Sequence, residues 1–528
     1  MPSGVIVSMA SHNSAKYIER ALASIDAALK GRPYVLVIAD DASTDDTVKI
    51  ARNFPMRAEE RVIVGLPKAP SIGEAKNRAV KLARPFLRKY PWVAFMDDDD
   101  EMLPGRFRTL LENMEAEGQK AGIGDWVHRP EGGAPNVISG DWSLHTKMFP
   151  PGVTLLHWDL IPKNGEYFVE TPENVHEDMV THHRLTLNGD PICYHGGDPV
   201  HTYYRRSTSF TGSPQRSTQM LHNSQEYLGR NFPESRTTIA SFCTVALGQS
   251  LSEAELMVKS LRLSGNDQPV LVLTDDFGAS KVSSWGVAGV ETMLGDPGAY
   301  SAHFKDSEVI YPNCSLNLGP FLGKMDVITE AAKRHGTTLY LDADMLVLQR
   351  FMDVIKTPIG LAPELSRSCQ TTSHSDWGTE KFGYFSGGYL YATKDAIHII
   401  NWWRREFLRS WRWFGSESRA HGGFTDQSGL NLIPLFEDVH VFHPGHNFMY
   451  TRVPHTVQRI TTVEDALENL KIRVGYGLYH RGWPILTVHA HFRVSTWADK
   501  LTRALKQTLA LSKDPVNQRI YALICERS

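Results

Sequence analysis

Short apolar runs alternate with amphipathic segments along the first part of the chain. Runs at residues 4–10, 34–39, 60–66 and 92–96 are rich in β-branched and other large apolar side chains, which predicts buried β-strands. Between them, residues 14–29 and 71–90 repeat apolar positions at helical spacing, and we expect Ser14 to cap the first of these helices. Strands that alternate with helices predict an α/β fold with a mostly parallel sheet flanked by helices.

The same pattern restarts after a polar stretch at residues 213–235, in which we expect a short helix and no strand. Strands are predicted at 237–247, 268–276 and 337–351, and helices at 250–265 and 319–336, the first of them with a capping box of Ser252 and Glu255. The organisation repeats although the residues do not. We therefore predict one domain at 1–212, a linker at 213–235, and a second domain at 236–528 that ends in a helical extension.

The composition narrows the class of protein. At 528 residues the chain is too long for one ordinary core, which favours several domains. Its 56 Lys and Arg against 59 Asp and Glu give a net charge of -3, so bulk charge argues neither for nucleic acid nor for an anionic membrane surface. No apolar run approaches the ~18 residues of a membrane span. Five scattered cysteines without CxxC spacing indicate free thiols, and we expect a cytoplasmic protein.

Acidic side chains follow two of the predicted strands in the first half. Asp40 and Asp41 end the second strand, and Asp97 to Asp100 end the fourth. Parallel strands bring their carboxyl ends to one edge of the sheet, where ligands of α/β proteins bind. Mg²⁺ and Mn²⁺ prefer carboxylate oxygens and commonly join proteins to phosphates. The acidic run therefore predicts a divalent cation that carries a diphosphate, whereas an isolated acidic turn would more often cap a helix or face water.

Three segments in this order, "VLVIADDASTDDT", "GEAKNRAV" and "VAFMDDDDEMLP", resemble the inverting glycosyltransferases of family 2, which have the GT-A fold. The resemblance covers about residues 3–210, and "YYRRSTSFT" (203–211) looks like the segment that closes these domains. It implies that a nucleotide-sugar and its metal are held by Asp40, Asp41, Asn77, Asp97, Asp98 and Asp99. In this scheme Asp40 and Asp41 meet the base and ribose. Asp97 and Asp99 lie at the metal and the diphosphate.

A fourth segment, "NVHEDMVTHHRL", resembles the acidic helix start of the same family, with Glu177 and Asp178. The resemblance implies that Asp178 is the base that takes a proton from the acceptor hydroxyl. The alternative is an acidic pair that the helix dipole favours at a helix N-terminus. His176, His182 and His183 suggest a metal, but histidines on a helix face more often belong to the surface or the core.

The second half resembles the retaining glycosyltransferases of family 8, also of GT-A fold, more loosely and over about residues 237–500. The likeness lies in "LYLDADMLVL", "FGYFSGGYLYATKDA", "GGFTDQSGLNLI" and "HAHFRVSTW". It implies metal ligands at Asp342, Asp344 and either His489 or His491. Both histidines can align, because the Gly and Lys-Pro of the family motif are absent here. A histidine ligand shifts the preference from Mg²⁺ toward Mn²⁺.

Further donor-site residues are expected in this half. The likeness implies that Gly387 and Gly388 form a floor beside the donor sugar, and that Asp426 and Gln427 lie on the β face of the sugar. We also expect donor contacts from Asp275 and Lys324.

The segment "NWWRREFLRSWRWF" (401–414) has two interpretations. It predicts a helix with Trp403, Phe407, Trp411 and Phe414 inward, or alternatively an aromatic platform for an acceptor.

These segments together predict a bifunctional glycosyltransferase that uses nucleotide-sugars, UDP-sugars being favoured, with Mn²⁺ or Mg²⁺. We expect the first domain to be inverting and the second retaining, because no second helix-start base follows "LDADM". The acceptor stays open between a glycan, a lipid-linked glycan, a protein and a hydroxymethylated base in viral DNA. The alternatives are a carbohydrate-binding scaffold with a degenerate domain, and a sugar-phosphate nucleotidyltransferase, which the absence of a "GxGxRxxxxT" loop disfavours.

Overall fold

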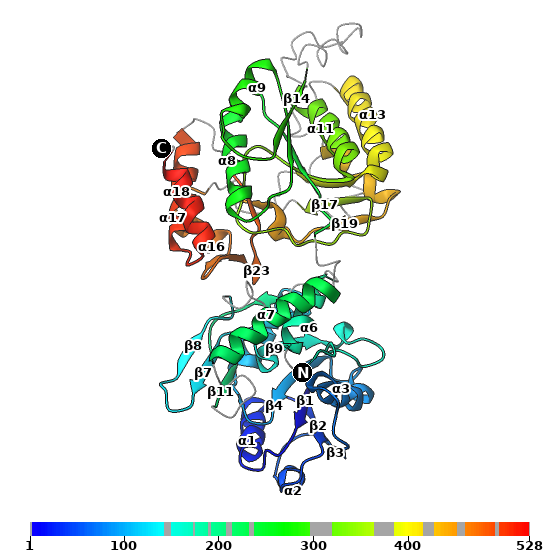
Figure 1. Cartoon of the computed structure of the whole chain (residues 1–528), viewed down its shortest axis with the longest axis vertical. Helices are drawn as coiled ribbons and strands as arrows, with labels where there is room; N and C mark the ends of the chain where they lie inside the picture. Colours follow the sequence, from blue (N-terminus) through cyan, green and yellow to red (C-terminus); the bar gives the residue numbers. More distant parts are fainter. Residues whose placement is uncertain are drawn as a thin grey trace. The chain divides into compact units, whose positions relative to one another are not determined.

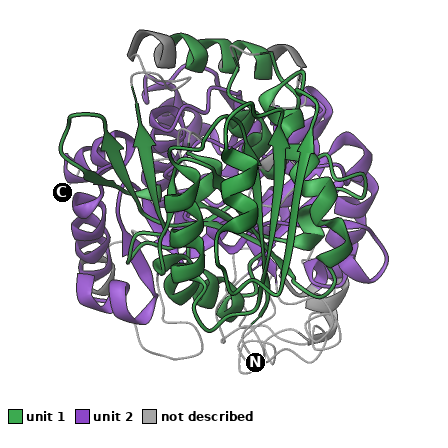
Figure 2. Cartoon of the chain, turned by 90° about the horizontal axis from the view of Figure 1, so that it is seen from below, with its two compact units in different colours: residues 1–235, 481–483 green, residues 236–480, 484–528 purple. Residues whose placement is uncertain are grey.

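The computed structural model describes residues 3–141, 149–172, 175–187, 192–206, 214–231, 237–295, 319–363, 385–414, 427–450, 460–490 and 496–526 (Figure 1). The chain divides into two compact units. Unit 1 comprises residues 1–235 and 481–483, and unit 2 comprises residues 236–480 and 484–528 (Figure 2). Each unit is a mixed α/β structure with a mainly parallel central sheet, as the sequence predicted.

A seven-stranded sheet forms the core of unit 1, in the order β3-β2-β1-β4-β9-β6-β10. Strands β3, β2, β1 and β4 are parallel, β9 is antiparallel to both of its neighbours, and β6 and β10 are parallel. The central strands are buried on both faces, which explains their continuous apolar runs. The strands are β1 (Val5–Ser11), β2 (Tyr34–Asp41), β3 (Glu60–Leu66), β4 (Trp92–Asp97), β6 (Ala121–Ile123), β9 (Thr154–His157) and β10 (Cys193–Tyr194).

Among the described residues of unit 1, a smaller four-stranded sheet, β5-β11-β7-β8, and six α-helices accompany the central sheet. Helix α3 packs its small apolar residues Ala79, Val80 and Ala83 against β1 and β2. The small-sheet strands are β5 (Glu101–Met102), β7 (Trp126–Pro130), β8 (Asn136–Ile138) and β11 (His201–Arg205). The helices are α1 (Ile18–Ala28), α2 (Thr47–Asn53), α3 (Ile72–Ala83), α4 (Glu112–Ala116), α6 (Glu177–Leu187) and α7 (Pro214–Asn231), with a π-helical turn at Arg106–Leu111.

The central sheet of unit 2 has the same topology. Its order is β14-β13-β12-β15-β18-β17-β19, with four parallel strands, one antiparallel strand, β18, and a final parallel pair. Numbered along the chain, both sheets read 3-2-1-4-6-5-7. The strands are β12 (Phe242–Val245), β13 (Val270–Thr274), β14 (Val290–Leu294), β15 (Thr337–Leu341), β17 (Ile359–Pro363), β18 (Phe385–Thr393) and β19 (Val439–Val441).

Unit 2 also has a three-stranded sheet, β16-β24-β20, which positions the site described below. Its first strand, β16, follows β15 in the chain. The remaining strands are β16 (Met345–Val347), β20 (Phe448–Met449), β21 (Ile472–Val474), β22 (Leu478–His480), β23 (Trp483–Pro484) and β24 (Thr487–His489). The helices are α8 (Ser250–Leu263), α9 (Asp276–Ser283), α11 (Gly319–His335), α13 (Ile397–Phe414), α15 (Gln427–Leu430), α16 (Val463–Asn469), α17 (Thr496–Leu511) and α18 (Pro515–Cys525).

Some local expectations were wrong. Helix α1 begins at Ile18, after a turn whose amides bond to the Ser14 carbonyl, so Ser14 does not cap it. Ser252 and Glu255 lie inside α8, because that helix already begins at Ser250. Much of the expected linker is the 18-residue helix α7, which packs Leu228 against Val175 and Met179 of unit 1.

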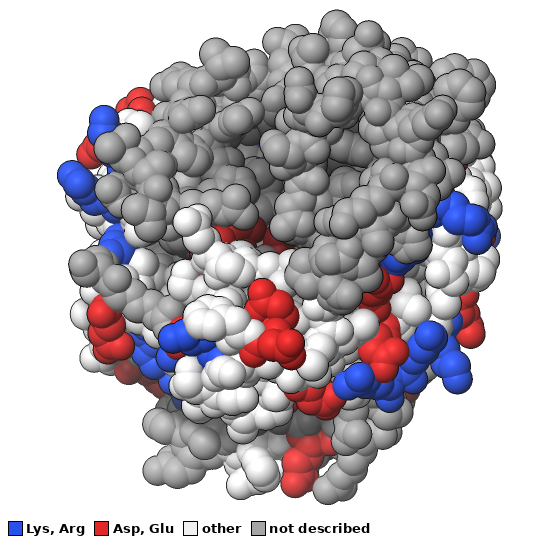
Figure 3. Space-filling view, turned by 90° about the horizontal axis from the view of Figure 1, so that it is seen from above, with Lys and Arg blue, Asp and Glu red and all other residues white. Residues whose placement is uncertain are grey.

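Two further expectations concern α13 and the surface. In α13 Trp403 and Phe407 are buried in the core, as the inward interpretation predicted, and the side chains of Trp411 and Phe414 lie outside the described ones. Acidic and basic side chains are interspersed among the described residues on the face of unit 2 in Figure 3, in keeping with the nearly balanced charge of the sequence. No helix in the described part of the chain is long and apolar enough to cross a membrane.

Candidate active sites

A cavity of about 400 Å³ opens at the carboxyl ends of β1, β2 and β4 in unit 1. Two lysines and four carboxylates line it, so it is built for a polar, charged ligand. These residues are Asp41, Lys68, Lys76, Asp97, Asp98 and Glu177. The sequence predicted a site at this edge of the sheet, and three of the six residues were among the expected donor ligands.

Of the two aspartates that end β2, only Asp41 lines the cavity. Its carboxylate accepts a hydrogen bond from the amide of Ala69 and pairs with Lys68 at 2.7 Å. Asp40 is buried, and its oxygens accept from Ser11 and from the amide and hydroxyl of Ser43. The structure therefore places Asp41 at the cavity, whereas Asp40 supports the loop after β2.

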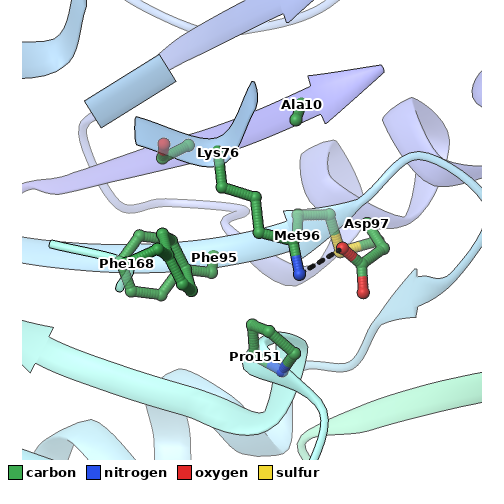
Figure 4. Close-up of a pocket in the computed structure, with 8 residues that line it drawn as sticks. Ala10, Lys76, Phe95, Met96, Asp97, Pro151 and Phe168 are labelled. Carbon is green, nitrogen blue, oxygen red and sulfur yellow. Dashed lines mark ion pairs between the residues drawn. The ribbon is translucent and has the colours of Figure 1, made fainter. Parts of the chain in front are cut away.

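The first two carboxylates of the run that follows β4 face the cavity. Asp97 is half-buried and its carboxylate lies 3.9 Å from the ammonium of Lys76 (Figure 4). Asp98 accepts a hydrogen bond from the amide of His12 at 2.9 Å. Burial raises the pKa of Asp98 to about 7, and its neighbours Asp99 and Asp97 add to the rise. A desolvated carboxylate such as Asp98, with a second carboxylate beside it, fits a divalent cation, whose charge would offset the cost of burial.

The other two carboxylates of the run have partners inside the protein. Asp99 pairs with the guanidinium of Arg206 at 2.5 Å. Asp100 is fully buried and lies 2.9 Å from His201. Burial raises the pKa of Asp100 and lowers that of His201 to about 3, so burial favours the neutral form of both groups. The expected metal ligand Asp99 is thus held by an arginine in this state.

Lys76 connects the acidic run to the start of α6. Its ammonium lies 2.7 Å from Glu177 and sits beside the rings of Phe95 and Phe168 in a small hollow with Asp97 (Figure 4). Burial opposes the charge of Glu177, but the attraction of Lys76 outweighs it and lowers the pKa of Glu177. Lys76 was not among the site residues predicted from the sequence. The available signal was a lysine at an apolar-face position of α3, three residues before Ala79 and four before Val80.

The expected base, Asp178, is half-buried at the first turn of α6, and its Oδ1 accepts from the amide of Met179. Burial raises the pKa of Asp178 to about 7, with a further rise from Glu177 that Lys76 partly offsets. Asn77, in contrast to Asp178, is fully buried, and its side-chain amide exchanges two hydrogen bonds with the backbone of Phe168. Asn77 does not line the cavity and holds Phe168 in place.

In unit 2 the structure brings Asp342, Asp344 and His489 together. Their ligand atoms lie within 4.8 Å of one another, and this is the only such group of three or more His, Cys, Asp or Glu side chains in the described residues. Asp342 follows β15, Asp344 precedes β16, and β16 pairs with β24 so that Met345 lies opposite His489. The pairing of β16 with β24 thus brings together Asp342 and His489, which are 147 positions apart in the sequence.

The chemistry of this group fits a divalent metal. Nε2 of His489 lies 3.1 Å from Oδ1 of Asp344, and Nδ1 lies 3.1 Å from the side-chain oxygen of Asn447. Nδ1 thus faces the acceptor oxygen of Asn447, and Nε2 is the ring nitrogen directed at the carboxylates. Two carboxylates and an imidazole nitrogen form a donor set that would suit Mn²⁺.

Two other expected residues border this group. A Cβ on Gly388 would lie 2.5 Å from Oδ2 of Asp342 and 3.0 Å from Cε1 of His489, so a larger residue there would displace these two side chains. Lys324 donates to the carbonyl of Gly387 at 2.8 Å and lies 3.4 Å from Asp342. Lys324, Gly387 and Gly388 therefore lie next to this group.

The remaining expected residues of unit 2 are not gathered there by the described structure. Asp275 caps α9, and its carboxylate accepts from the amide of Gly278. Gln427 begins α15, where the backbone alone is described. Asp426 and His491 lie outside the described residues.

The N-terminal part of the chain is similar to known proteins. Residues 6–170 match the family model described as Glycosyl transferase family 2. The succinoglycan biosynthesis protein ExoO of Rhizobium meliloti (strain 1021) is 31% identical over 116 residues, which cover 22% of this chain and 31% of that protein. ExoU of the same strain is 29% identical over 110 residues, covering 21% and 30%. The match thus spans less than a third of either relative.

Solved structures of two proteins are also similar. S. aureus TarS 1–349 in complex with UDP-GlcNAc has 21% sequence identity and a TM-score of 0.33, covering 40% of this chain and 61% of that one. The galactosyltransferase LgtC, in complex with donor and acceptor sugar analogs, has 16% identity and a TM-score of 0.32, covering 53% and 99%. From the match of residues 6–170, the chain carries a glycosyltransferase family 2 domain at its N-terminus.

Proposed function

We propose that the chain is a bifunctional, metal-dependent glycosyltransferase with one active site in each unit. The observation that carries the proposal is the pairing of a family 2 domain in unit 1 with a two-aspartate, one-histidine centre at the equivalent strand end of unit 2. Both centres follow the fourth strand of sheets that share the order 3-2-1-4-6-5-7. The shared position supports a shared use, the binding of a nucleotide-sugar diphosphate.

In unit 1 the proposed reaction inverts the anomeric carbon. The donor occupies the cavity of about 400 Å³, with its diphosphate toward Asp97 and Asp98. Asp178 takes the proton of the acceptor hydroxyl as that oxygen attacks, and its pKa of about 7 suits a base at neutral pH. Lys76 holds Glu177 charged and fixes the start of α6. A bound divalent cation would offset the charge of the departing diphosphate.

In unit 2 we propose retention of configuration. Asp342, Asp344 and His489 would hold the metal, and Lys324 lies close enough to meet a phosphate of the donor. The close approach of Gly388 to two of these ligands supports a backbone floor against which the donor can lie. From an α-linked donor the product would be α-linked, whereas unit 1 would give a β-linked product.

The acceptor that we favour is a glycan, because both curated relatives are named as succinoglycan biosynthesis proteins. A UDP-sugar is the donor that we would test first. A degenerate unit that only binds carbohydrate is the alternative. The ligand group of unit 2 and the carboxylates of Asp97 and Asp98 in the cavity of unit 1 count against it.

Donor hydrolysis tests the proposal without knowledge of the acceptor. The wild-type protein, Asp97→Asn and Asp344→Asn would each be incubated with UDP-, GDP- and CMP-sugars and Mn²⁺, and nucleotide release would be measured. We expect each variant to lose hydrolysis of one donor and keep the other, or to lose about half if both sites use the same donor. Loss of all hydrolysis in either folded variant would contradict two independent sites, and no Mn²⁺-dependent hydrolysis at all would contradict the proposed activity.

A further inference from the structure

Asn447 contacts the proposed metal centre of unit 2 without belonging to it. The residue ends the turn Pro444–Asn447 and immediately precedes β20. Strand β20 runs parallel to β24, with Met449 opposite His489, and the amide of Tyr450 donates to the His489 carbonyl at 3.0 Å. Backbone pairing therefore fixes Asn447 beside the histidine from the side opposite β16.

The side chain of Asn447 is fully buried and makes one hydrogen bond. Its Oδ1 accepts from Nδ1 of His489 at 3.1 Å, while its Nδ2 has no hydrogen-bond partner. A buried amide that leaves its own N–H groups unpaired costs free energy, typically about 1–3 kcal/mol. An apolar residue of the same size would avoid that cost, so stability alone does not explain an asparagine at this position.

The turn that carries Asn447 is held on both sides. His446 pairs with Asp353 at 2.8 Å, and the hydroxyl of Thr487 in β24 donates to the His446 carbonyl. These contacts tie the turn to the strand that carries His489. The Asn447 oxygen is thus a fixed acceptor, not a mobile one.

We infer that Asn447 is the positioning residue of the unit 2 metal centre: it holds His489 as the tautomer whose Nε2 lone pair faces Asp342 and Asp344. This inference rests on the proposed function, because it presumes that the three ligands take a metal. Outer partners that orient a ligating histidine usually change metal affinity by ~10–100-fold when they are removed. Removal of the Asn447 oxygen frees the ring to turn and to place its hydrogen on Nε2, which blocks coordination.

The test measures Mn²⁺ affinity of the full chain from the electron paramagnetic resonance of free Mn²⁺. All proteins carry Asp97→Asn, so that the ion counted belongs to unit 2. We expect Asn447→Leu to weaken Mn²⁺ binding by ~10–100-fold, and Asn447→Asp to keep it, because a carboxylate accepts the same hydrogen. The visible absorption of bound Co²⁺ should change in the Leu variant and stay close to the parent in the Asp variant.

Asn517 supplies a matched control. It is also a buried asparagine of unit 2 with one hydrogen-bonded side-chain atom, Nδ2 to Ser512 at 3.1 Å, and one unpartnered atom, Oδ1. Asn517→Leu should leave Mn²⁺ affinity unchanged, and thermal unfolding without metal compares the structural cost of both substitutions. Equal affinities in Asn447→Leu and its parent, or an equal loss in the two Leu variants, would overturn the positioning role.

The outcomes separate this inference from the proposed function. If the parent binds Mn²⁺ and Asp344→Asn abolishes the binding, the centre stands and the Asn447 variants decide the inference. If the parent binds no Mn²⁺, or binds it equally well with Asp344→Asn, the metal centre itself fails and the inference with it.

Discussion

Arg206 donates from its guanidinium to both the carboxylate and the carbonyl of Asp99, with Nη1 2.5 Å from Oδ2. The guanidinium also stacks on Tyr17, at 3.6 Å from the ring centre. Asp99 of unit 1 therefore has an internal cation as its partner, whereas the corresponding carboxylate of unit 2, Asp344, pairs with His489.

The first prediction follows from this pairing. Arg206→Gln should raise the Mn²⁺ affinity of unit 1 by about tenfold, because removal of about 1.4 kcal/mol of competing attraction corresponds to that factor. Binding would be measured in an Asp344→Asn background, so that only unit 1 contributes. The neighbouring Arg205→Gln makes the same change of charge and should have little effect. Unchanged or weaker binding in Arg206→Gln would show that Arg206 does not compete with the metal.

The second prediction concerns the base of unit 1. Asp178→Asn should lower turnover by ~10²–10⁴ while donor and Mn²⁺ affinities stay near wild type, because the cavity carboxylates are untouched. In the wild type, turnover should fall as the pH decreases below about 7, where Asp178 takes up a proton. Pre-steady-state rates and a donor-binding titration separate the two effects. A variant that retains more than a tenth of the activity would exclude Asp178 as the base.

The third prediction is a stability change at the same residue. The folded protein raises the pKa of Asp178 from 3.8 to about 7, so it binds a proton more tightly than the unfolded chain. The free energy of unfolding that depends on Asp178 therefore decreases as the pH rises from about 4 to about 7. Asp178→Asn removes this loss and should stabilise the protein at pH 8 by a few kcal/mol at most, at about 1.4 kcal/mol for each pKa unit.

Urea unfolding at several pH values measures this effect. The gain should shrink toward zero near pH 4, where the wild-type carboxyl is protonated in both states. A gain that is the same at pH 4 and pH 8 would assign the stabilisation to packing and not to the charge.

The fourth prediction concerns the glycine floor of unit 2. Gly388→Ala places a Cβ against Asp342 and His489 and should abolish the Mn²⁺ binding of unit 2 at millimolar concentrations while leaving unit 1 active. Gly323→Ala is the control, since its Cβ meets only flexible side-chain atoms of Leu273 and Val245. If Gly388→Ala binds Mn²⁺ as the wild type does, the ligands are not where the structure places them.

The architecture could be predicted from the sequence because the spacing of apolar residues reflects the local secondary structure. The runs "ERVIVGL" and "WVAFM" became β3 and β4 with bounds within one residue of those expected. Helix starts were less accessible, as Ser14 and Ser252 show. Both are good capping residues, but the backbone of the preceding turn decides where a helix begins.

The site was accessible in part for a similar reason. The ends of the strands indicated where Asp41 and Asp97 would gather in unit 1 and, separately, where Asp344 would lie in unit 2, since parallel strands share an edge. They could not tell us which carboxylates already have partners. Lys76 and Arg206 reach the acidic run from other elements, α3 and the end of β11, and that pairing depends on tertiary distances. The contact of Asn447 with His489 could not be predicted for the same reason.

The strand order common to both sheets has a consequence for how the chain folds. A ribosome delivers all seven strands of the first sheet by residue 194, before β12 at Phe242 has been made. The non-local pairing that makes parallel sheets slow to form is therefore divided between two periods of synthesis. Because the two sheets have the same topology, a strand of one sheet can wrongly take the position of the equivalent strand in the other. Vectorial synthesis protects against this misassembly, because β1 can already be enclosed between β2 and β4 when its counterpart emerges.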